Sequence, residues 1–275
     1  HWMVHSFPTR RSSDLDKYPL PEKFSFSQLA AYSTCPLQYK FAFILKVPVP
    51  SDKASFIFGR VIHNTLYNFL LPLLDERRQA SLFADSGAEQ SLITEQRLLD
   101  LYAEFWQPDG YETKEDRDRY RAKGRTALKS FWRSLQGQPL PDVMFLEKKF
   151  SFRLGDDTIK GTIDRVDRLP DGTLAIIDYK TGKGKERLEF ADKRQLILYQ
   201  MFLEEFLGKK VSSLSFYYLE SGMQLSFVAT EKDFSKLREQ MLTEIASIKR
   251  REFAPTPSMM CGYCDFRDIC EFRQA

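Results

Sequence analysis

An acid and a lysine stand two residues apart at the end of a strongly apolar stretch. Asp178 and Lys180 follow the run Leu174-Ala-Ile-Ile177. Side chains alternate along a strand, so Asp178 and Lys180 should point to the same face. A buried carboxylate is costly unless it is paired or put to use. A further acid, Asp164, lies one predicted strand earlier across a tight hairpin, and we expect it to lie near Asp178.

The chemistry that these three side chains allow is metal-assisted hydrolysis of a phosphodiester bond. Two carboxylates that converge on one point are ligands that Mg²⁺ or Mn²⁺ prefers. A lysine beside them can orient the attacking water or stabilise negative charge that develops on the phosphate. The alternative for the Asp-x-Lys triplet taken alone is a structural ion pair on a strand, because such triplets are common.

All four cysteines of the chain belong to one pattern, Cys35 followed much later by Cys261, Cys264 and Cys270. Four thiolates can hold either a [4Fe–4S] cluster or Zn²⁺, and the spacing does not decide between them. Free or disulfide-bonded thiols are the remaining alternative. Because Cys35 lies so far from the other three, a shared cofactor would tie the end of the chain to its first helices and contribute to folding.

The acidic residues are expected on strands. Alternating apolar residues bounded by turn residues indicate strands, and Pro170-Asp-Gly172 has hairpin chemistry. The five strands that we expect are residues 143–154, 158–169, 173–179, 211–219 and 224–230. Together with flanking helices they predict an α/β layer architecture.

Apolar residues at helical spacing predict the helices around these strands. Ser27 is expected to cap the first, after a short strand or turn at Phe24. The polar segment 75–138 is expected to be a helical insert, broken near Gly87 and at 107–110. The remaining expected helices are residues 38–45, 59–74, 188–207 and 233–250.

Bulk composition excludes several classes of protein. The formal net charge of the 275 residues is only +3, so any basic surface for nucleic acid must be local. No stretch approaches the roughly 18 apolar residues that a membrane helix needs, and we find no signal peptide. Four cysteines are too few for a disulfide scaffold. These features favour a reducing cytoplasm and a metal site.

The first fifteen residues match nothing in the patterning that follows. The segment His5 to Leu15 resembles the in-frame translation of a short sequencing adaptor. We expect residues 1–15 to be foreign to the natural protein, which would then begin further upstream. A disordered polar tail is the alternative. Residues 16–275 are expected to form one domain, with its core at about 143–230 and the helical insert at about 75–140.

Five motifs in this order resemble the RecB-type branch of the PD-(D/E)XK nucleases, and the resemblance covers residues 24 to 273. They are Gly59-Arg-Val-Ile-His63, Gly161-Thr-Ile-Asp164-Arg-Val-Asp167, Ile177-Asp-Tyr-Lys-Thr-Gly182, Gln195-Leu-Ile-Leu-Tyr199 and the cysteine pattern. The resemblance implies a restriction-endonuclease-like fold, with a central mixed sheet flanked by helices, an N-terminal helical segment and a C-terminal iron–sulfur staple.

The resemblance also implies a role for each matching residue. Asp164 and Asp178 would bind Mg²⁺ or Mn²⁺, with the Tyr179 carbonyl as a further oxygen. His63, the only histidine after the first fifteen residues, would complete or adjoin the metal site, and the alternative is a core histidine. Lys180 would be the catalytic lysine.

Gln195 and Tyr199 are four residues apart, so they share a helix face. The resemblance implies that they line the active site and contact DNA, and the alternative is a core tyrosine beside an exposed glutamine. Glu147 matches an acidic position of the family less securely, and it either supports the metal ligands or is a surface strand residue. Asp167 should point away from Asp164 and pair structurally with Arg165.

Two groups of basic residues could contact phosphates. The first follows the catalytic lysine, where a solvated loop is the alternative; it comprises Lys183, Lys185, Arg187, Lys193 and Arg194. The second lies at helical spacing, where a solvated helix face carrying Glu115, Asp116 and Asp118 is the alternative; it comprises Arg117, Arg121 and Arg125.

The resemblance favours one cofactor and one function. Cys35-Pro36 and the three C-terminal cysteines look like the [4Fe–4S] arrangement of AddB-type and CRISPR-adaptation nucleases. The expected function is metal-dependent cleavage of single-stranded or end-derived DNA in recombination and repair. A UvrD/AddA-like helicase is the expected partner, fused upstream or separate, because the chain has no Walker A motif. The alternatives are a CRISPR-adaptation nuclease and a non-catalytic DNA-binding module.

Overall fold

The computed structural model describes residues 18–49, 54–74 and 93–274, so the expectations for residues 1–15 and for a break near Gly87 lie outside the described residues. The chain divides into two compact units. The terminal unit comprises the chain up to Pro50, Arg153–Lys160 and the chain from Arg238, and the central unit comprises Ser51–Phe152 and Gly161–Leu237.

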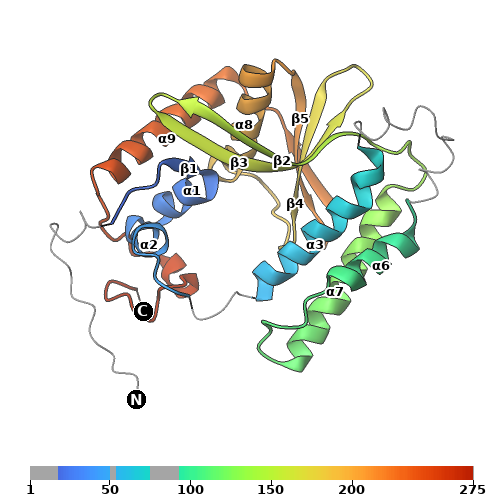
Figure 1. Cartoon of the computed structure of the whole chain (residues 1–275), viewed down its shortest axis with the longest axis horizontal. Helices are drawn as coiled ribbons and strands as arrows, with labels where there is room; N and C mark the ends of the chain where they lie inside the picture. Colours follow the sequence, from blue (N-terminus) through green and yellow to red (C-terminus); the bar gives the residue numbers. More distant parts are fainter. Residues whose placement is uncertain (1–17, 50–53, 75–92, 275) are drawn as a thin grey trace. The chain divides into compact units, whose positions relative to one another are not determined.

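Runs of helices and runs of strands follow one another along the chain (Figure 1). In chain order they are β1 (Lys23–Ser25), α1 (Phe26–Thr34), α2 (Pro36–Tyr39), the π-helical turn η2 (Lys40–Ile44), α3 (Ala54–Leu70), the 3₁₀ turn η3 (Leu71–Leu73), α6 (Glu95–Phe105), α7 (Lys114–Ser134), β2 (Asp142–Leu154), β3 (Asp157–Arg168), β4 (Leu174–Lys180), α8 (Phe190–Met201), η4 (Phe202–Phe206), β5 (Val211–Tyr218), β6 (Met223–Phe227), α9 (Glu231–Lys249) and η5 (Met259–Tyr263).

All five expected strands are present, and they form a mixed sheet. In the central unit β4 pairs antiparallel with β3, with Val166 opposite Ile176. On its other side β4 pairs in parallel with β5, with Asp178 opposite Phe216, and β6 continues the sheet antiparallel to β5. Strand β2 also pairs with β3. Within the terminal unit, β1 is parallel to the start of β3.

Strand β4 lies at the centre of the sheet because it is apolar on both faces. Its residues from Leu174 to Tyr179 are all buried, as expected of a strand covered on both sides. One face carries Ala175, Ile177 and Tyr179 into the core that α3, α6 and α7 build. Helix α8 packs against β4 and β5 and lies between them in the chain. The predicted central mixed sheet flanked by helices is therefore confirmed.

Two predicted helix starts are wrong. Ser25, not Ser27, caps α1, because Gln28 stands three residues later and completes a capping box: the Gln28 N–H donates to Ser25 Oγ and the Ser25 N–H donates to Gln28 Oε1. Helix α3 begins at Ala54 and ends at Leu70, one residue before the 3₁₀ turn that contains Pro72. None of the described helices is both long and apolar enough to cross a membrane.

Candidate metal centres

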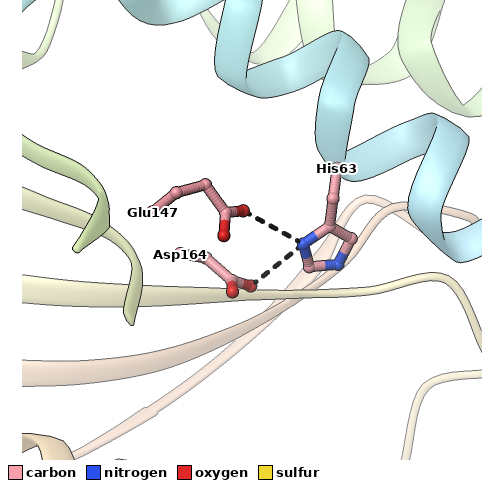
Figure 2. Close-up of side chains that lie close together, drawn as sticks. All are labelled: His63, Glu147 and Asp164. Carbon is pink, nitrogen blue, oxygen red and sulfur yellow. Dashed lines mark ion pairs between the residues drawn. The ribbon is translucent and has the colours of Figure 1, made fainter. Parts of the chain in front are cut away.

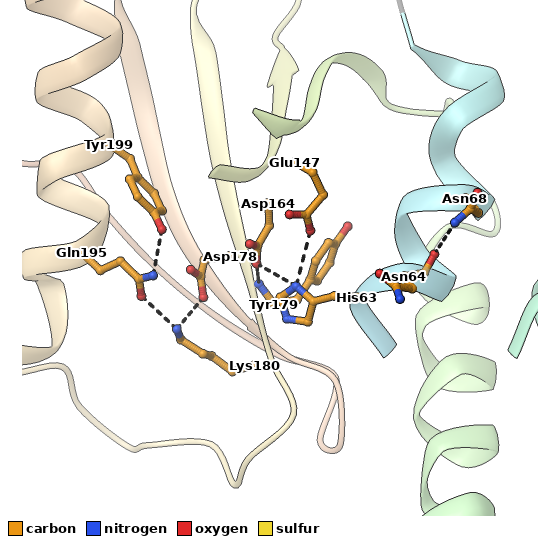
Figure 3. A network of polar contacts seen from close by, with 10 residues as sticks. All are labelled: His63, Asn64, Asn68, Glu147, Asp164, Asp178, Tyr179, Lys180, Gln195 and Tyr199. Atoms are coloured by element: carbon orange, nitrogen blue, oxygen red, sulfur yellow. Dashed lines mark hydrogen bonds and ion pairs between the residues drawn. The ribbon is translucent and has the colours of Figure 1, made fainter. Parts of the chain in front are cut away.

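The predicted catalytic residues come together in the central unit (Figure 3). Helix α3 supplies His63, β3 supplies Asp164 and β4 supplies Asp178 and Lys180. The two residues of β4 share a face as expected, and Lys180 Nζ lies 2.7 Å from Asp178 Oδ2. The hairpin between β3 and β4 places Asp164 against β4, where its Oδ2 accepts a hydrogen bond of 2.9 Å from the Tyr179 N–H.

Three side chains form a group with the geometry of a metal site (Figure 2). His63 Nδ1 lies 3.6 Å from Glu147 Oε1 and 3.6 Å from Asp164 Oδ2. Among the residues that the structure describes, this is the one set of three or more His, Cys, Asp or Glu ligand atoms that lie within 4.8 Å of one another. One imidazole and two carboxylates fit a divalent cation such as Mg²⁺ or Mn²⁺.

The Glu147 carboxylate lies in one group with the ligand atoms of His63 and Asp164. The sequence had left Glu147 either as a support for the metal ligands or as a surface residue of a strand. Its backbone has a φ of 45°, which L-residues seldom adopt. Such a conformation costs about 1–3 kcal/mol and persists where surrounding contacts hold it. The regular alternation of buried and exposed residues in β2 begins only after Lys148. The unusual backbone therefore interrupts the strand where the carboxylate turns toward the site.

The electrostatics of the group reflect buried and closely spaced carboxylates. Burial raises the pKa of Asp164 to about 7, and the nearby Asp178 carboxylate adds to this rise while His63 opposes it. Burial alone would lower the pKa of His63, but Glu147, Asp164 and Asp178 together raise it to about 9. Negative charge is thus in excess, and a divalent cation would relieve the same repulsion that keeps protons on the group.

Asp178 is predicted to be a metal ligand, but it is not among the three grouped side chains. It is buried, and burial raises its pKa while Lys180 opposes the rise. Its carboxylate is in close contact with the Lys180 ammonium group, and it is not part of the His63–Glu147–Asp164 group. Metal binding by Asp178 and by the Tyr179 carbonyl stays a prediction.

Gln195 and Tyr199 of α8 reach the site through Lys180. Gln195 Oε1 accepts a hydrogen bond of 3.0 Å from Lys180 Nζ, and Gln195 Nε2 donates to the Tyr199 hydroxyl at 2.8 Å. Tyr199 is only 4% exposed, which leaves little of its side chain for DNA, and that contact stays a prediction. Burial also raises its pKa and keeps the hydroxyl protonated. The pair fixes the position of the Lys180 ammonium group.

Asp167 is structural, as expected. The guanidinium of Arg165 donates to both carboxylate oxygens of Asp167, with 2.7 Å between Arg165 Nε and Oδ1. Arg165 also donates to the Tyr179 hydroxyl at 2.9 Å. All three side chains are buried. The pair therefore anchors Tyr179, whose backbone N–H holds the Asp164 carboxylate.

Several of the basic residues after Lys180 contact other side chains of the protein. Lys185 pairs with Asp192 and Arg187 with Glu189. Arg194 is 7% exposed, which leaves little of its side chain for a bound strand, and its contact with DNA stays a prediction. Lys193 Nζ lies 5.1 Å from the ring centre of Phe227. DNA contacts by Lys183, Lys185 and Arg187 stay predictions. On α7, the first arginine of the second basic group, Arg117, pairs with Asp118.

The four cysteines gather in the terminal unit. All are free thiols, and all line one cavity together with apolar residues such as Phe41 and Phe266. The Thr256 N–H points to Cys35 Sγ and the Ser258 N–H to Cys261 Sγ, each at 3.4 Å. The bond from Ser258 lowers the pKa of the Cys261 thiol, and burial raises that of Cys264. Four thiols around one cavity fit a thiophilic metal or cluster.

Comparison with known proteins places this geometry in a family. No curated protein sequence matches the chain. One similar solved structure is that of SSO0001, with 13% sequence identity over 96% of this chain and 94% of that one and a TM-score of 0.43, a likeness too distant to bear on the reaction. The sequence profile of the PD-(D/E)XK nuclease superfamily matches residues 23–271. This match contains the His63–Glu147–Asp164 group, Lys180 and all four cysteines, and the chain belongs to the PD-(D/E)XK nuclease superfamily.

Proposed function

We propose that the protein hydrolyses phosphodiester bonds of DNA with the help of Mg²⁺ or Mn²⁺. The observation that carries the proposal is the coexistence of two features in one unit. The His63–Glu147–Asp164 group offers three ligand atoms for a cation. Beside it, Lys180 presents an ammonium group that Asp178 and Gln195 hold in place. Metal-assisted phosphate hydrolysis uses this combination of ligands and positive charge.

Each residue of the site has its own role in the proposed reaction. His63, Glu147 and Asp164 would hold the cation, with Asp178 and the Tyr179 carbonyl as further ligands. When bound there, the cation supplies a Lewis acid for the phosphate and lowers the pKa of water. An ammonium group has three N–H donors, and Asp178 and Gln195 engage two of those on Lys180, which leaves one for the attacking water or a phosphate oxygen.

Tyr199 sets the orientation of this arrangement. Its hydroxyl accepts from the Gln195 amide nitrogen, so the amide oxygen of Gln195 faces Lys180. A glutamine turned the other way would present N–H donors to an ammonium group and repel it. Tyr199 therefore acts through Gln195 on the position of Lys180.

We also propose that Cys35, Cys261, Cys264 and Cys270 hold a [4Fe–4S] cluster. The shared cavity and the resemblance to AddB-type nucleases support the cluster, and Zn²⁺ is the alternative for the same thiolates. Protein purified without oxygen should show a broad absorbance band near roughly 400 nm, which iron–sulfur clusters have and Zn²⁺ lacks. Stoichiometric zinc with no such band would contradict the cluster.

The motif order supports a place in the RecB/AddB branch, and we propose that the protein processes DNA ends in recombination or repair beside a UvrD/AddA-like helicase. Co-purification of a helicase subunit with the tagged protein, or a helicase encoded in the same reading frame, would support this partnership. A coding sequence flanked by CRISPR-adaptation genes would contradict it.

The nuclease assay tests the central proposal. Labelled single-stranded and duplex oligonucleotides are incubated with the holoprotein in Mg²⁺, in Mn²⁺ and in excess chelator. Cleavage should require the cation, and Lys180→Ala should suppress it while the fold remains intact by circular dichroism. Equal cleavage by Lys180→Ala would point to a contaminating nuclease and remove the support for the proposal.

A further inference from the structure

A large aromatic side chain stands exposed on the helix that carries His63. Phe56 of α3 is 66% exposed, although most phenylalanines of a folded protein are inside. Phe56, Arg60 and His63 are spaced four and three residues apart, so they follow one another along one helix face. Phe56 is thus about two helical turns, or roughly 10 Å, from the metal group.

Arg60 extends this face toward a group of aromatic residues. Its Nη2 donates to Gln107 Oε1 at 2.9 Å. The residue before Gln107, Trp106, stacks on Tyr111 with 5.4 Å between ring centres. The guanidinium of Arg121 lies 6.0 Å from the centre of the Trp106 ring. Basic and aromatic side chains therefore alternate over neighbouring parts of α3, α7 and the segment after α6.

The same end of α3 adjoins the chain that leaves the catalytic strand. A methyl group placed on Gly59 would lie 3.7 Å from the Thr181 hydroxyl oxygen, and Thr181 directly follows Lys180. The first half of α3 and the segment after Lys180 are therefore neighbours. A ligand that lies on Phe56 and Arg60 would be continuous with the metal group.

We propose that this face is the path by which single-stranded DNA reaches the metal group, with a base stacked on Phe56 and a phosphate bound by Arg60. The proposal rests on the proposed nuclease function, because it names how that substrate reaches that site. Unpaired bases stack on exposed aromatic rings, whereas bases inside a duplex are already stacked on one another. The surface should therefore favour single strands over intact duplexes.

The charge of this face indicates that stacking dominates over phosphate binding. Asp109 and Glu112 are exposed in the segment that holds Trp106 and Tyr111, so the basic residues have acidic neighbours. Removal of the Phe56 ring should thus weaken binding of a single strand more than removal of the Arg60 charge does.

Binding is measured by fluorescence anisotropy with a labelled oligothymidylate and a blunt duplex of equal length, in Mg²⁺. Every protein carries Lys180→Ala, so that the DNA survives. Phe56→Ala should weaken single-strand binding roughly five- to 150-fold, and Phe56→Trp should keep it. Arg60→Gln should lower the slope of log affinity against log salt by roughly 0.7.

Phe206→Ala is the matched control, because Phe206 is also exposed, at 45%, but lies on η4. Unchanged single-strand affinity in a folded Phe56→Ala protein, or an equal loss in Phe206→Ala, would overturn the proposal. Cleavage by proteins with Lys180 intact separates the two proposals. Wild-type cleavage with unchanged Phe56→Ala binding overturns only the path, whereas Phe56-dependent binding without any cleavage supports the path and overturns the nuclease function.

Discussion

The two candidate metal sites are built in opposite ways. The His63–Glu147–Asp164 group lies on one long helix and two strands of a sheet, and a backbone hydrogen bond holds Asp164 in place. The cysteine site draws Cys35 from the start of the chain and its other thiols from a terminal segment whose regular structure is one short 3₁₀ turn. That segment leaves Met259 and Tyr263 90% and 78% exposed and buries Phe266, so its apolar burial is limited.

This difference leads us to expect that the two proposed metals have different roles. Strands and helices already place the side chains of the first group, so we expect its proposed cation to serve the reaction and not the fold. The terminal segment has little regular structure, so we expect its proposed cofactor to contribute to folding.

The largest effect should follow loss of the cysteine site. Cys35→Ser should abolish cofactor binding and lower the melting temperature by about 10 °C or more, because a structural metal contributes its binding energy to folding. Thr34→Ser, beside the same cavity, is the control. Differential scanning calorimetry measures the change. A Cys35→Ser protein that melts with the wild type would refute a structural role for the cofactor.

Lys180→Ala should do the opposite, with a large loss of rate and little loss of stability. We expect the cleavage rate to fall about 10²- to 10³-fold, as on removal of one charge that stabilises a transition state. Lys180 is half-buried, and the buried Asp178, whose pKa burial raises, can take up a proton once the ammonium group is gone, so the melting temperature should move by only about 1–2 °C. A collapse of stability together with rate would show that the two sites do not differ in the way described.

Cation affinity at the first group should rise with pH. Protons compete with the cation for Asp164, whose pKa is about 7, and for His63, whose pKa is about 9. As the pH rises from 6 to 9 these protons leave, so the affinity for Mn²⁺ should increase, by up to about tenfold per pH unit for each proton released. Calorimetric titration measures it. His63→Gln should flatten the upper half of the curve, and an affinity independent of pH in the wild type would contradict the assignment of ligands.

Tyr199→Phe should give the smallest effect. It removes one hydrogen bond to Gln195 without touching Lys180, and such a bond contributes about 0.5–1.5 kcal/mol. The rate of cleavage at saturating DNA should fall about two- to twelvefold, with substrate affinity unchanged. Loss of affinity in place of rate would mean that α8 contacts DNA.

The regular elements and the Asp178–Lys180 face were predictable because they depend on local periodicity. Alternation along β4 alone places the two side chains together. The apolar run before them also predicts a strand covered on both faces. Pairing of β4 with β5 in parallel could not be obtained in this way, because strand order depends on contacts distant in sequence.

The sequence says least about residues whose burial depends on neighbours distant in the chain. Arg194 looked like one more cation of a basic stretch, but its position on α8 turns it inward. Tyr199 was rightly placed beside Gln195, yet its burial became visible only with the sheet behind it. Glu147 was left between two roles, because no pattern of apolar residues signals a left-handed backbone inside a strand.

That backbone at Glu147 has a consequence for motion. A residue with an unfavourable backbone φ relaxes to an ordinary φ when no contact holds its side chain in place. Without cation, the middle of β2 should therefore open more often than β4, and the amides near Leu146 and Lys148 should exchange hydrogen faster with solvent. Saturating Mn²⁺ should slow this hydrogen exchange even when no DNA is present. The exchange rate of the segment would then show how fully the cation site is occupied.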